Sequence, residues 1–299
     1  LKEVKNMKQF ITETMSFASG ILSHISEGMV HSVYRKTINL RMGSSLVALQ
    51  AAGSPLSPVS LITGLDVGEM SGLPVVPGDQ VFVDKKTIIL FSKSSRIIFR
   101  FDEAAIYDSL LRDYAVPLPL PAIKESLLQS SSGGLTELFS KALLKNPSDF
   151  AKGVFLAVAQ KRMEDARKEV LDICYDKAAV TLAGMTGLGM GLTPSGDDFL
   201  CGVLAGLLFS GQWDHPFAQA LRQTISRRLG DTNDISRTFL SCALSCHFSR
   251  PVKELPLASG TTEILSSFGA IGHSSGFDTL CGIYYGYTLC LGQEDVPGK

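Results

Sequence analysis

The sequence predicts an α+β protein in which a β-rich, barrel- or sandwich-like N-terminal domain precedes a mainly α-helical domain. Two observations support this prediction. Short runs of β-branched and aromatic residues separated by Pro and Gly fill residues 30–101, and the apolar spacing becomes helical after residue 102. A chain of 299 residues is long enough for two domains, and we expect them at residues 1–110 and 111–299.

In the β-rich part, each expected strand is a short apolar run. The runs are SVYRKTINLRM, SSLVALQ, VSLITG, DQVFVD, TIILF and RIIFRF, with turn-forming segments such as SPLSP and LPVVPGD between them. The stretch VFVDKKTIILF predicts a hairpin across Asp84, Lys85 and Lys86. Residues 8–30 read as a short amphipathic opening that is interrupted by Gly20 and Gly28.

The helical part begins, in this interpretation, at AAIYDSLLRDYA, where Ile106, Leu110 and Leu111 have helical spacing. Its prolines make VPLPLPAI an extended link, and SSSGG at residues 130–134 reads as a flexible joint. Beyond this joint, we expect helices in TELFSKALLK, in the long stretch of residues 150–184 and in QALRQTISRRLG.

Composition excludes several classes of protein. Lys and Arg total 28 against 29 Asp and Glu, so the basic excess of a nucleic-acid-binding protein is missing. The longest strongly apolar run, Phe199–Phe209, is far shorter than the roughly 20 residues of a membrane-spanning helix, and no secretory signal is visible. The six cysteines lie in apolar surroundings, as buried cytosolic thiols do. We expect a cytoplasmic protein that binds neither nucleic acid nor membrane, with part of its weakly charged surface covered by other subunits.

The helical part contains an internal repeat. SGDDFLCG at residues 195–202 recurs eighty positions later as SGFDTLCG at residues 275–282, with six identical positions of eight. Matched glycines extend the register in both directions, Gly206 with Gly286 and Gly189 with Gly269. Two copies of one loop-helix unit predict a pseudo-twofold arrangement, in which the helices pack closely and both loops lie at one end.

Each copy has a glycine-rich approach, polar residues and then a helix start. The first turn of a helix has free amides and a partial positive charge, so it can hold a phosphate or carboxylate without lysine. The polar groups of both loops lie in an apolar region and need partners, which a bound anion or metal ion provides. Alternatively, Ser and Asp only cap the two helices, and the glycines only permit packing. The candidate anion-binding residues are Gly189, Gly191, Thr193, Ser195, Gly196, Asp197, Ser274, Ser275, Gly276 and Asp278.

Three side chains in these loops offer further chemistry. The adjacent Asp197 and Asp198 can cap a helix, position a nucleophile or hold Mg²⁺. His273 can stabilise an oxyanion or transfer a proton, or it can serve as a structural hydrogen-bond donor. The sequence has no Walker A lysine, no G-x-S-x-G elbow and no dinucleotide-binding βαβ unit, so we expect no organic cofactor.

A third polar segment, GDTNDISR at residues 230–237, lies between the two copies. Arg237 can reach an anion through two hydrogen bonds, and Thr232 and Ser236 are candidates beside it. In the alternative interpretation, Ser236 or Asp234 only caps the helix that follows.

The stretch GMGLTPSGDDFLCGVLAG, the TNDIS turn and GHSSGFDTLCGIYYG resemble the AllH-type subunit of bacterial oxamate carbamoyltransferase, a family first described as a domain of unknown function. The GLTPSGDD motif is the specific part, and the resemblance covers residues 180–290. It implies one subunit of a three-component enzyme of anaerobic allantoin and purine degradation. The implied reaction interconverts oxalurate plus phosphate with oxamate plus carbamoyl phosphate.

This resemblance agrees with the residues, because these substrates are small anions. In this hypothesis the backbone of both loops holds the anions, Asp198 is the base or metal ligand, and His273 polarises the carbamoyl carbonyl. Neither loop contains Lys or Arg, whereas the carbamoyl-phosphate sites of aspartate and ornithine transcarbamylases are rich in arginine. Either a partner subunit supplies cations, or this chain is a non-catalytic structural or anion-binding subunit of the complex.

Overall fold

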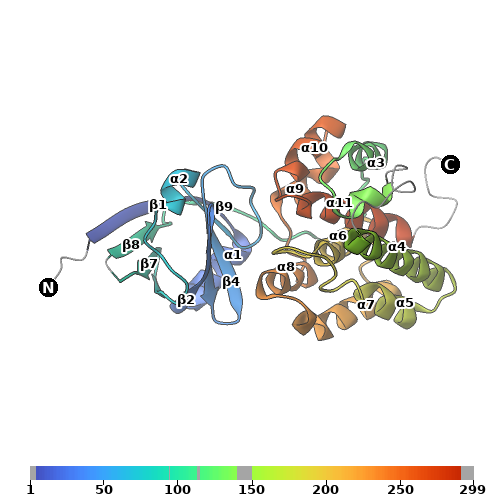
Figure 1. Cartoon of the computed structure of the whole chain (residues 1–299), viewed down its shortest axis with the longest axis horizontal. Coiled ribbons are helices and arrows are strands. Elements are labelled where there is room, and N and C mark those ends of the chain that lie inside the picture. The colour runs from blue at the N-terminus through green and yellow to red at the C-terminus, as the bar shows by residue number, and fades with distance from the viewer. Residues whose placement is uncertain (1–4, 94, 113–114, 140–149, 291–299) are drawn as a thin grey trace. The chain divides into compact units, whose positions relative to one another are not determined.

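The computed structural model describes residues 5–93, 95–112, 115–139 and 150–290. The chain divides into two compact units, Leu1–Leu110 and Leu111–Lys299 (Figure 1), and each is described by itself. The first unit contains the strands and the second is helical, so the predicted α+β class is confirmed. None of the described helices is long and apolar enough to cross a membrane.

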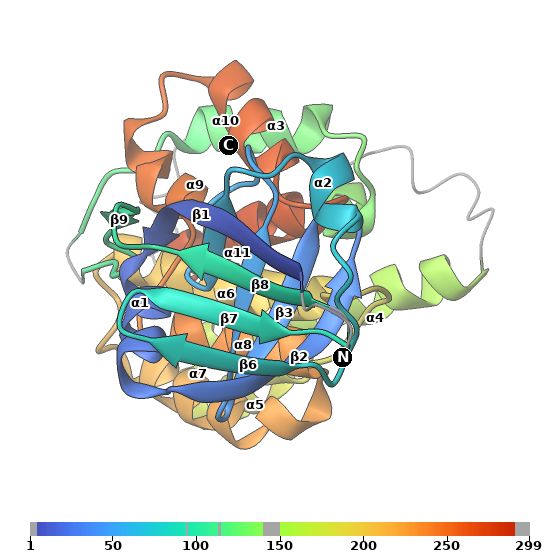
Figure 2. The ribbon, with the colours of Figure 1, turned by 90° about the vertical axis from the view of Figure 1, so that its left-hand side faces the viewer.

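Eight strands of the first unit close into a barrel, which faces the viewer in Figure 2. These eight strands are β1 Lys5–Met15, β2 Glu27–Tyr34, β3 Thr37–Met42, β4 Ser45–Gln50, β5 Ser60–Thr63, β6 Gln80–Asp84, β7 Thr87–Phe91 and β8 Ser95–Arg100, and a further strand is β9 Ala105–Tyr107. Their order is β5-β4-β3-β2-β6-β7-β8-β1, and pairing of β1 with β5 closes the ring. The ninth strand, β9, pairs with the end of β1. Two short helices, α1 Ser16–His24 and α2 Val67–Ser71, complete the unit.

The barrel interior follows from alternation along the strands. In β6 and β7, Val81, Val83, Ile88 and Leu90 are buried, and the residues between them are more exposed. These two strands form the predicted hairpin, in which Asp84 pairs with Thr87 across a two-residue loop. Of the two architectures predicted for this part, the barrel is therefore the one observed.

Two local predictions in this unit are wrong. Residues 8–30 are not one amphipathic opening, because they contain most of β1, all of α1 and the start of β2. The partners of β1 are β5, β8 and β9, which lie far along the chain, so no local pattern shows this strand. The segment AAIYDSLLRDYA is not a helix either. Its first residues form β9, in which Ile106 is 60% exposed and pairs with Thr14.

The second unit is built from helices around one apolar core. Its elements are α3 Leu120–Gln129, η1 Gly134–Phe139, α4 Phe150–Leu171, α5 Tyr175–Ala183, α6 Ser195–Phe209, α7 Pro216–Arg227, η3 Leu229–Asp231, α8 Asp234–Leu244, α9 Arg250–Glu254, η4 Leu255–Leu257, α10 Thr261–Gly269 and α11 Ser275–Leu289. Every residue of α6 except Cys201 is buried, so this helix forms the centre of the core. The expected helix in TELFSKALLK is a 3₁₀ segment as far as Phe139, and its remainder lies outside the described residues.

The repeat predicted two neighbouring helices, and α6 and α11 confirm it (Figure 1). A Cβ atom placed on Gly202 would lie 2.9 Å from the Cα atom of Gly282, and the reverse substitution gives the same distance. Further along, Cβ atoms on Gly206 and Gly286 would meet the other helix one turn later. Contacts in equal register mean that the helices run in the same direction, which brings their N-termini together at one end.

The backward extension of the repeat is wrong. The Gly196 amide donates to the carbonyl of Leu188 eight positions earlier, whereas the equivalent Gly276 amide donates to Ile271 only five positions earlier. The first loop is therefore three residues longer, and Gly269 is the last residue of α10 rather than the counterpart of Gly189. Because α6 and α11 pack on each other, the residues within the two helices are repeated. The loop that precedes each helix is not held by this packing, so its length can differ.

Candidate functional site

The two loops of the repeat meet at the N-termini of α6 and α11. The Thr193 and Ser275 hydroxyl groups, one from each loop, form a hydrogen bond of 2.7 Å. Within the described residues no side chain caps either helix, so the simple capping alternative does not describe Ser195 or Ser275. The polar residues of the two loops thus face one another, as the sequence predicted.

Two carboxyl groups come from equivalent positions of the repeat and lie buried in this region. Asp198 is 9% exposed and Asp278 is fully buried. Each has one oxygen, Oδ2, for which the described part of the chain provides no hydrogen-bond partner. The other Asp278 oxygen accepts a hydrogen bond of 2.6 Å from the backbone amide of Leu135. Buried polar atoms are almost always bonded, so these two oxygens point to a ligand or a proton.

Burial changes the acidity of both groups. It raises the pKa of Asp278 to about 6, although the Leu135 amide acts in the opposite direction. Burial raises the pKa of Asp198 well above its usual range. The hydroxyl of Ser275 opposes this rise, and the negative charge of Asp278 adds to it. Both carboxyl groups therefore hold their protons to a higher pH than an exposed carboxyl group does.

Asp197 has a different environment from its neighbour. Its Oδ1 atom accepts a hydrogen bond of 2.8 Å from the Gly187 amide, and its Oδ2 atom accepts one of 2.6 Å from the Thr232 hydroxyl. Burial raises the pKa of Asp197, and these bonds lower it. The side chain therefore joins α6 to the glycine loop and to the turn before α8. Its counterpart in the second copy is Phe277, which lies in the core.

Arg237 holds the turn between the two copies together. Its Nε atom donates to the Leu229 carbonyl at 2.9 Å, Nη1 to Asp234 Oδ1 at 2.9 Å and Nη2 to the Thr232 carbonyl at 3.3 Å. These bonds use all three guanidinium nitrogens within the turn. The side chain therefore acts as a local clamp in this structure.

The cap of α8 is a residue that the sequence analysis missed. The Asn233 side-chain oxygen accepts hydrogen bonds from the amides of Ile235 and Ser236, so neither Ser236 nor Asp234 caps the helix. Asn is as good an N-cap as Ser or Asp. Asn233 precedes both Asp234 and Ser236 in the sequence, and this order could have identified it as the cap. The Ser236 hydroxyl is buried beside Asp197 and lowers the pKa of that carboxyl group.

The glycines of both loops permit close backbone approach. Gly189 and Gly191 have φ angles of +124° and +104°, which favour glycine, and a Cβ atom on Gly189 would lie 2.8 Å from the Ser195 nitrogen. The amides of Gly196 and Gly276 already donate to earlier backbone carbonyls. Hydroxyl and carboxyl groups therefore remain the main polar groups that face between the loops. Ser274 precedes α11 and its carbonyl accepts the Asp278 amide at 2.8 Å.

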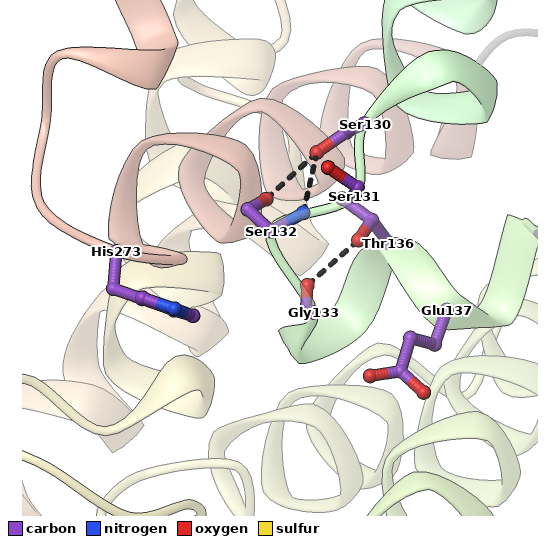
Figure 3. Close-up of a pocket in the computed structure, with 7 residues that line it drawn as sticks. All are labelled: Ser130, Ser131, Ser132, Gly133, Thr136, Glu137 and His273. Atoms are coloured by element: carbon purple, nitrogen blue, oxygen red, sulfur yellow. Dashed lines mark hydrogen bonds between the residues drawn. The ribbon is translucent and has the colours of Figure 1, made fainter.

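The second loop also borders a pocket of about 420 Å³ (Figure 3). His273 lines it together with Ser130, Ser131, Ser132, Gly133, Thr136 and Glu137. The sequence predicts only a flexible joint for this serine-rich segment. Its run of hydroxyls and glycines resembles the loops of the repeat, and that was the signal available. Gly134, at the end of the segment, packs so closely on the Asp278 carboxyl that a Cβ atom would clash with it.

Two family models match the chain. The model described as oxamate carbamoyltransferase subunit AllH matches residues 185–287, and the one described as the AllH family N-terminal domain matches residues 6–106. The chain belongs to the AllH family. The N-terminal match shows that the barrel is part of the family architecture, although the sequence analysis found no motif there. No solved structure matches the chain.

The AllH match contains both loops of the repeat, both paired carboxyl groups and the turn that Arg237 clamps. The family is described as a subunit of oxamate carbamoyltransferase, so other subunits complete the enzyme. The pocket segment, residues 130–137, lies between the two matched ranges. Among the described residues of this AllH chain, no group of three or more His, Cys, Asp or Glu side chains is arranged to hold a metal ion.

Proposed function

We propose that this chain carries the carbamoyl-transfer site of oxamate carbamoyltransferase, between oxalurate plus phosphate and oxamate plus carbamoyl phosphate. One observation carries the proposal: Asp198 and Asp278, from equivalent positions of the repeat, are buried and each has an oxygen with no hydrogen-bond partner among the described residues. The family description names the enzyme, and the two carboxyl groups are able to transfer a proton inside a buried site.

Breakdown of oxalurate by carbamoyl transfer requires that the oxamate nitrogen receive one proton. In the direction of oxalurate breakdown, a phosphate oxygen attacks the carbamoyl carbon and forms a C–O bond. The C–N bond then breaks, its electron pair stays on the oxamate nitrogen, and that nitrogen takes a proton. An acid whose pKa lies near or above neutrality can donate this proton, and its conjugate base takes the proton back in the reverse direction.

Asp198 suits this acid-base role and Asp278 supports it. Burial and the neighbouring carboxylate favour the protonated form of Asp198, whose pKa lies well above its usual range. Asp278, with a pKa of about 6, provides that neighbouring negative charge at neutral pH. A protonated Asp198 also repels an anionic substrate less than a carboxylate would. The two groups titrate as a coupled pair.

Other groups of the chain would bind and orient the substrate. The hydroxyls of Thr193 and Ser275 lie where the loops meet and can donate to substrate oxygens. His273 is exposed beside them and is the candidate donor to the carbamoyl carbonyl. The loops contain no Lys or Arg, and Arg237 is held by its turn. We therefore propose that the other subunits, two in number as the resemblance implies, supply cations for the phosphate.

A Mg²⁺ ion held by Asp197 and Asp198 is a further hypothesis from the sequence. Both Asp197 oxygens accept hydrogen bonds inside the chain, so Asp198 is the member of the Asp197–Asp198 pair with an oxygen available for a metal ion. If Mg²⁺ neutralises the phosphate, EDTA abolishes activity and added Mg²⁺ restores it. Full activity in EDTA removes Mg²⁺ from the proposal.

A second candidate is a structural subunit without catalytic groups. Two observations favour it, namely the tight glycine packing of α6 on α11 and the lack of cationic residues in both loops. In this case the repeat serves helix packing, and other subunits carry the chemistry.

Reconstitution with the other subunits distinguishes the two candidates. The assay supplies oxalurate and phosphate and measures carbamoyl phosphate and oxamate. Under our proposal, an enzyme assembled with an Asp198→Asn, Asp278→Asn double variant keeps its subunit composition and loses its activity. A fully active enzyme with this double variant would show that the chain is a structural subunit. Placing the reaction in anaerobic allantoin degradation needs a separate test, which is growth on allantoin after deletion of the gene.

A further inference from the structure

The outer surface of the barrel has an apolar face that the proposed function does not use. Figure 2 shows β1, β8, β7 and β6 side by side on the wall of the barrel that faces the viewer. Because side chains alternate along a strand, every second residue of these strands points outward. The outward apolar residues here and on the adjoining β2 are exposed or partly exposed, and they are Phe10, Met29, Phe82, Ile89, Phe91 and Ile98. We call these six residues the outer face.

The strand register makes the centre of the outer face continuous. Phe82 pairs with Ile89 and Ile89 pairs with Ile98, so these three residues form one apolar row across β6, β7 and β8. Phe91 lies two residues along β7 from Ile89, and its ring meets that of Phe82 edge to face with 5.4 Å between the centroids. The exposure is large at the sides, where Phe10 is 55% exposed and Phe82 is 37% exposed. A contiguous apolar patch of this kind is typical of a surface that another protein covers.

The charged residues around the outer face are divided by sign. The side formed by β1 and β8 has exposed cationic residues, which are Lys8, Arg96 and Arg100, and the side formed by β6 and β2 has the exposed acids Asp84 and Glu27. Lys8 pairs with Ile98, and Glu27 pairs with Phe82. Lys8 and Glu27 therefore lie at opposite ends of the apolar row. A surface with this division of charge is complementary to a copy of itself that is turned by half a revolution.

We propose that the outer face binds the outer face of a second copy of this chain in a twofold dimer. A twofold axis that runs along β7 in the plane of contact places β8 of one copy over β6 of the other. Ile89 then meets Ile89 of the second copy, and Ile98 meets its Phe82. At both ends of the row, Lys8 of one copy meets Glu27 of the other. The contact has an apolar centre and a charged rim, as protein interfaces do, and it is independent of the proposed function.

Sedimentation velocity of the full chain tests this dimer through a charge exchange. Arg100 already pairs with Asp102, so Lys8 and Glu27 are the residues to change. Lys8→Glu places two acids opposite each other at both ends of the row, and Glu27→Lys places two lysines there. Each variant alone should therefore weaken the dimer about tenfold or more. In an equal mixture, each end joins an acid to a lysine, so a mixed dimer about as stable as the wild type should form. Lys36→Glu makes the same charge change in the turn before β3, and this matched control should leave the dimer unchanged.

A second variant tests the apolar centre of the outer face. Phe82→Ser removes a ring that is already partly exposed, so the chain should keep its melting temperature and sediment as a monomer. The inference is overturned if the wild-type chain is a monomer at high micromolar concentration, if the dimer persists in both charge variants, or if their mixture stays monomeric. If the wild-type chain is a monomer and Phe82→Ser prevents the other subunits from binding, the outer face serves another subunit and the proposed dimer is wrong.

Discussion

The two copies of the repeat share a helix start but differ in how their acidic residues are used. Asp198 and Asp278 occupy the same position in both copies, and both are buried with an oxygen that lacks a partner in the described structure. The preceding position holds Asp197 in the first copy and Phe277 in the second. Asp197 accepts hydrogen bonds from Gly187 in the glycine loop and from Thr232 in the turn before α8, whereas Phe277 packs in the apolar core. The proposed site therefore uses the acid that both copies share, whereas the unshared Asp197 organises its own loop.

The shared acids also differ from each other. Hydroxyl groups lie near both acids, those of Ser275 and Thr193 near Asp198 and those of Ser195 and Ser274 near Asp278. Asp278 is in addition anchored by the backbone amide of Leu135. Burial raises the pKa of both, but the charge of Asp278 raises that of Asp198 further. A duplicated motif has thus produced two carboxyl groups with unequal acidity, which is the arrangement that separates a proton donor from its charged neighbour.

The largest expected effect tests the shared position. Asp198→Asn removes the proton carrier and keeps the size of the side chain, so kcat of the reconstituted enzyme should fall about 10³-fold, within the range of general acid-base catalysis. The melting temperature should change little, because the protonated carboxyl group of Asp198 and the amide of Asn are both neutral and similar in size. Asp172→Asn, next to the end of α4, is the control. Wild-type turnover in Asp198→Asn would mean that the shared acid has no catalytic role.

A second prediction tests the symmetry of the helix pair. Gly202→Ala and Gly282→Ala each place a methyl group against backbone atoms of the other helix, so each should lower the free energy of unfolding by about 3 kcal/mol. Urea denaturation measures this. Gly230→Ala, which has no atom within 4 Å of the added Cβ, should change stability by less than about 0.5 kcal/mol. A large difference between Gly202→Ala and Gly282→Ala would contradict the twofold arrangement.

The third prediction separates the unshared acid from the shared one. Asp197→Asn can still accept from the Gly187 amide but loses the charged acceptor of Thr232, so stability should fall by about 2 kcal/mol. Thr232→Val should have a similar effect, and the two changes should not be additive. The reconstituted enzyme should keep most of its kcat. If Asp197→Asn lowers kcat as far as Asp198→Asn does, the division of roles between the two acids is wrong.

The sequence predicted the fold where the signal was local and failed where partners were distant. The hairpin of β6 and β7 depends on neighbouring residues, and it was predicted at its observed place. Strand β1 was missed, because its partners begin some fifty residues later. The helix expected at Ile106 was wrong for the same reason, since pairing with β1 outweighs helical spacing. Apolar spacing alone does not report which strand lies beside which.

For the site, the repeat predicted that the two loops converge, and the Thr193–Ser275 hydrogen bond shows it. The environments of the individual acids were not predictable, because they depend on segments outside the repeat. Asp197 is bonded by Thr232 and Asp278 by Leu135, and neither partner follows from the motif. The pocket segment was interpreted as a joint, because serines and glycines in sequence have the same composition in a linker and in a binding loop.

The smallest expected effect is a pH dependence that belongs to Asp278. Its folded pKa of about 6 lies above the usual value of 3.8, so the folded state holds the proton over a range in which the unfolded chain has lost it. Stability is therefore greatest at low pH and is lost as the pH rises toward and through 6. Between about pH 5 and pH 7 this one group should lower the free energy of unfolding by about 1 kcal/mol.

Other groups titrate over the same range, so the measurement has to isolate Asp278. Asp278→Asn in the wild type would also remove the charge that raises the pKa of Asp198. The comparison is therefore made between Asp198→Asn and the Asp198→Asn, Asp278→Asn double variant, in which the Asn oxygen can still accept the Leu135 amide. Urea denaturation at the two pH values should show the extra loss of about 1 kcal/mol in the single variant alone. Equal pH dependence in both would show that Asp278 is charged at pH 5 already, and the unequal acidity of the two copies would then lose its physical basis.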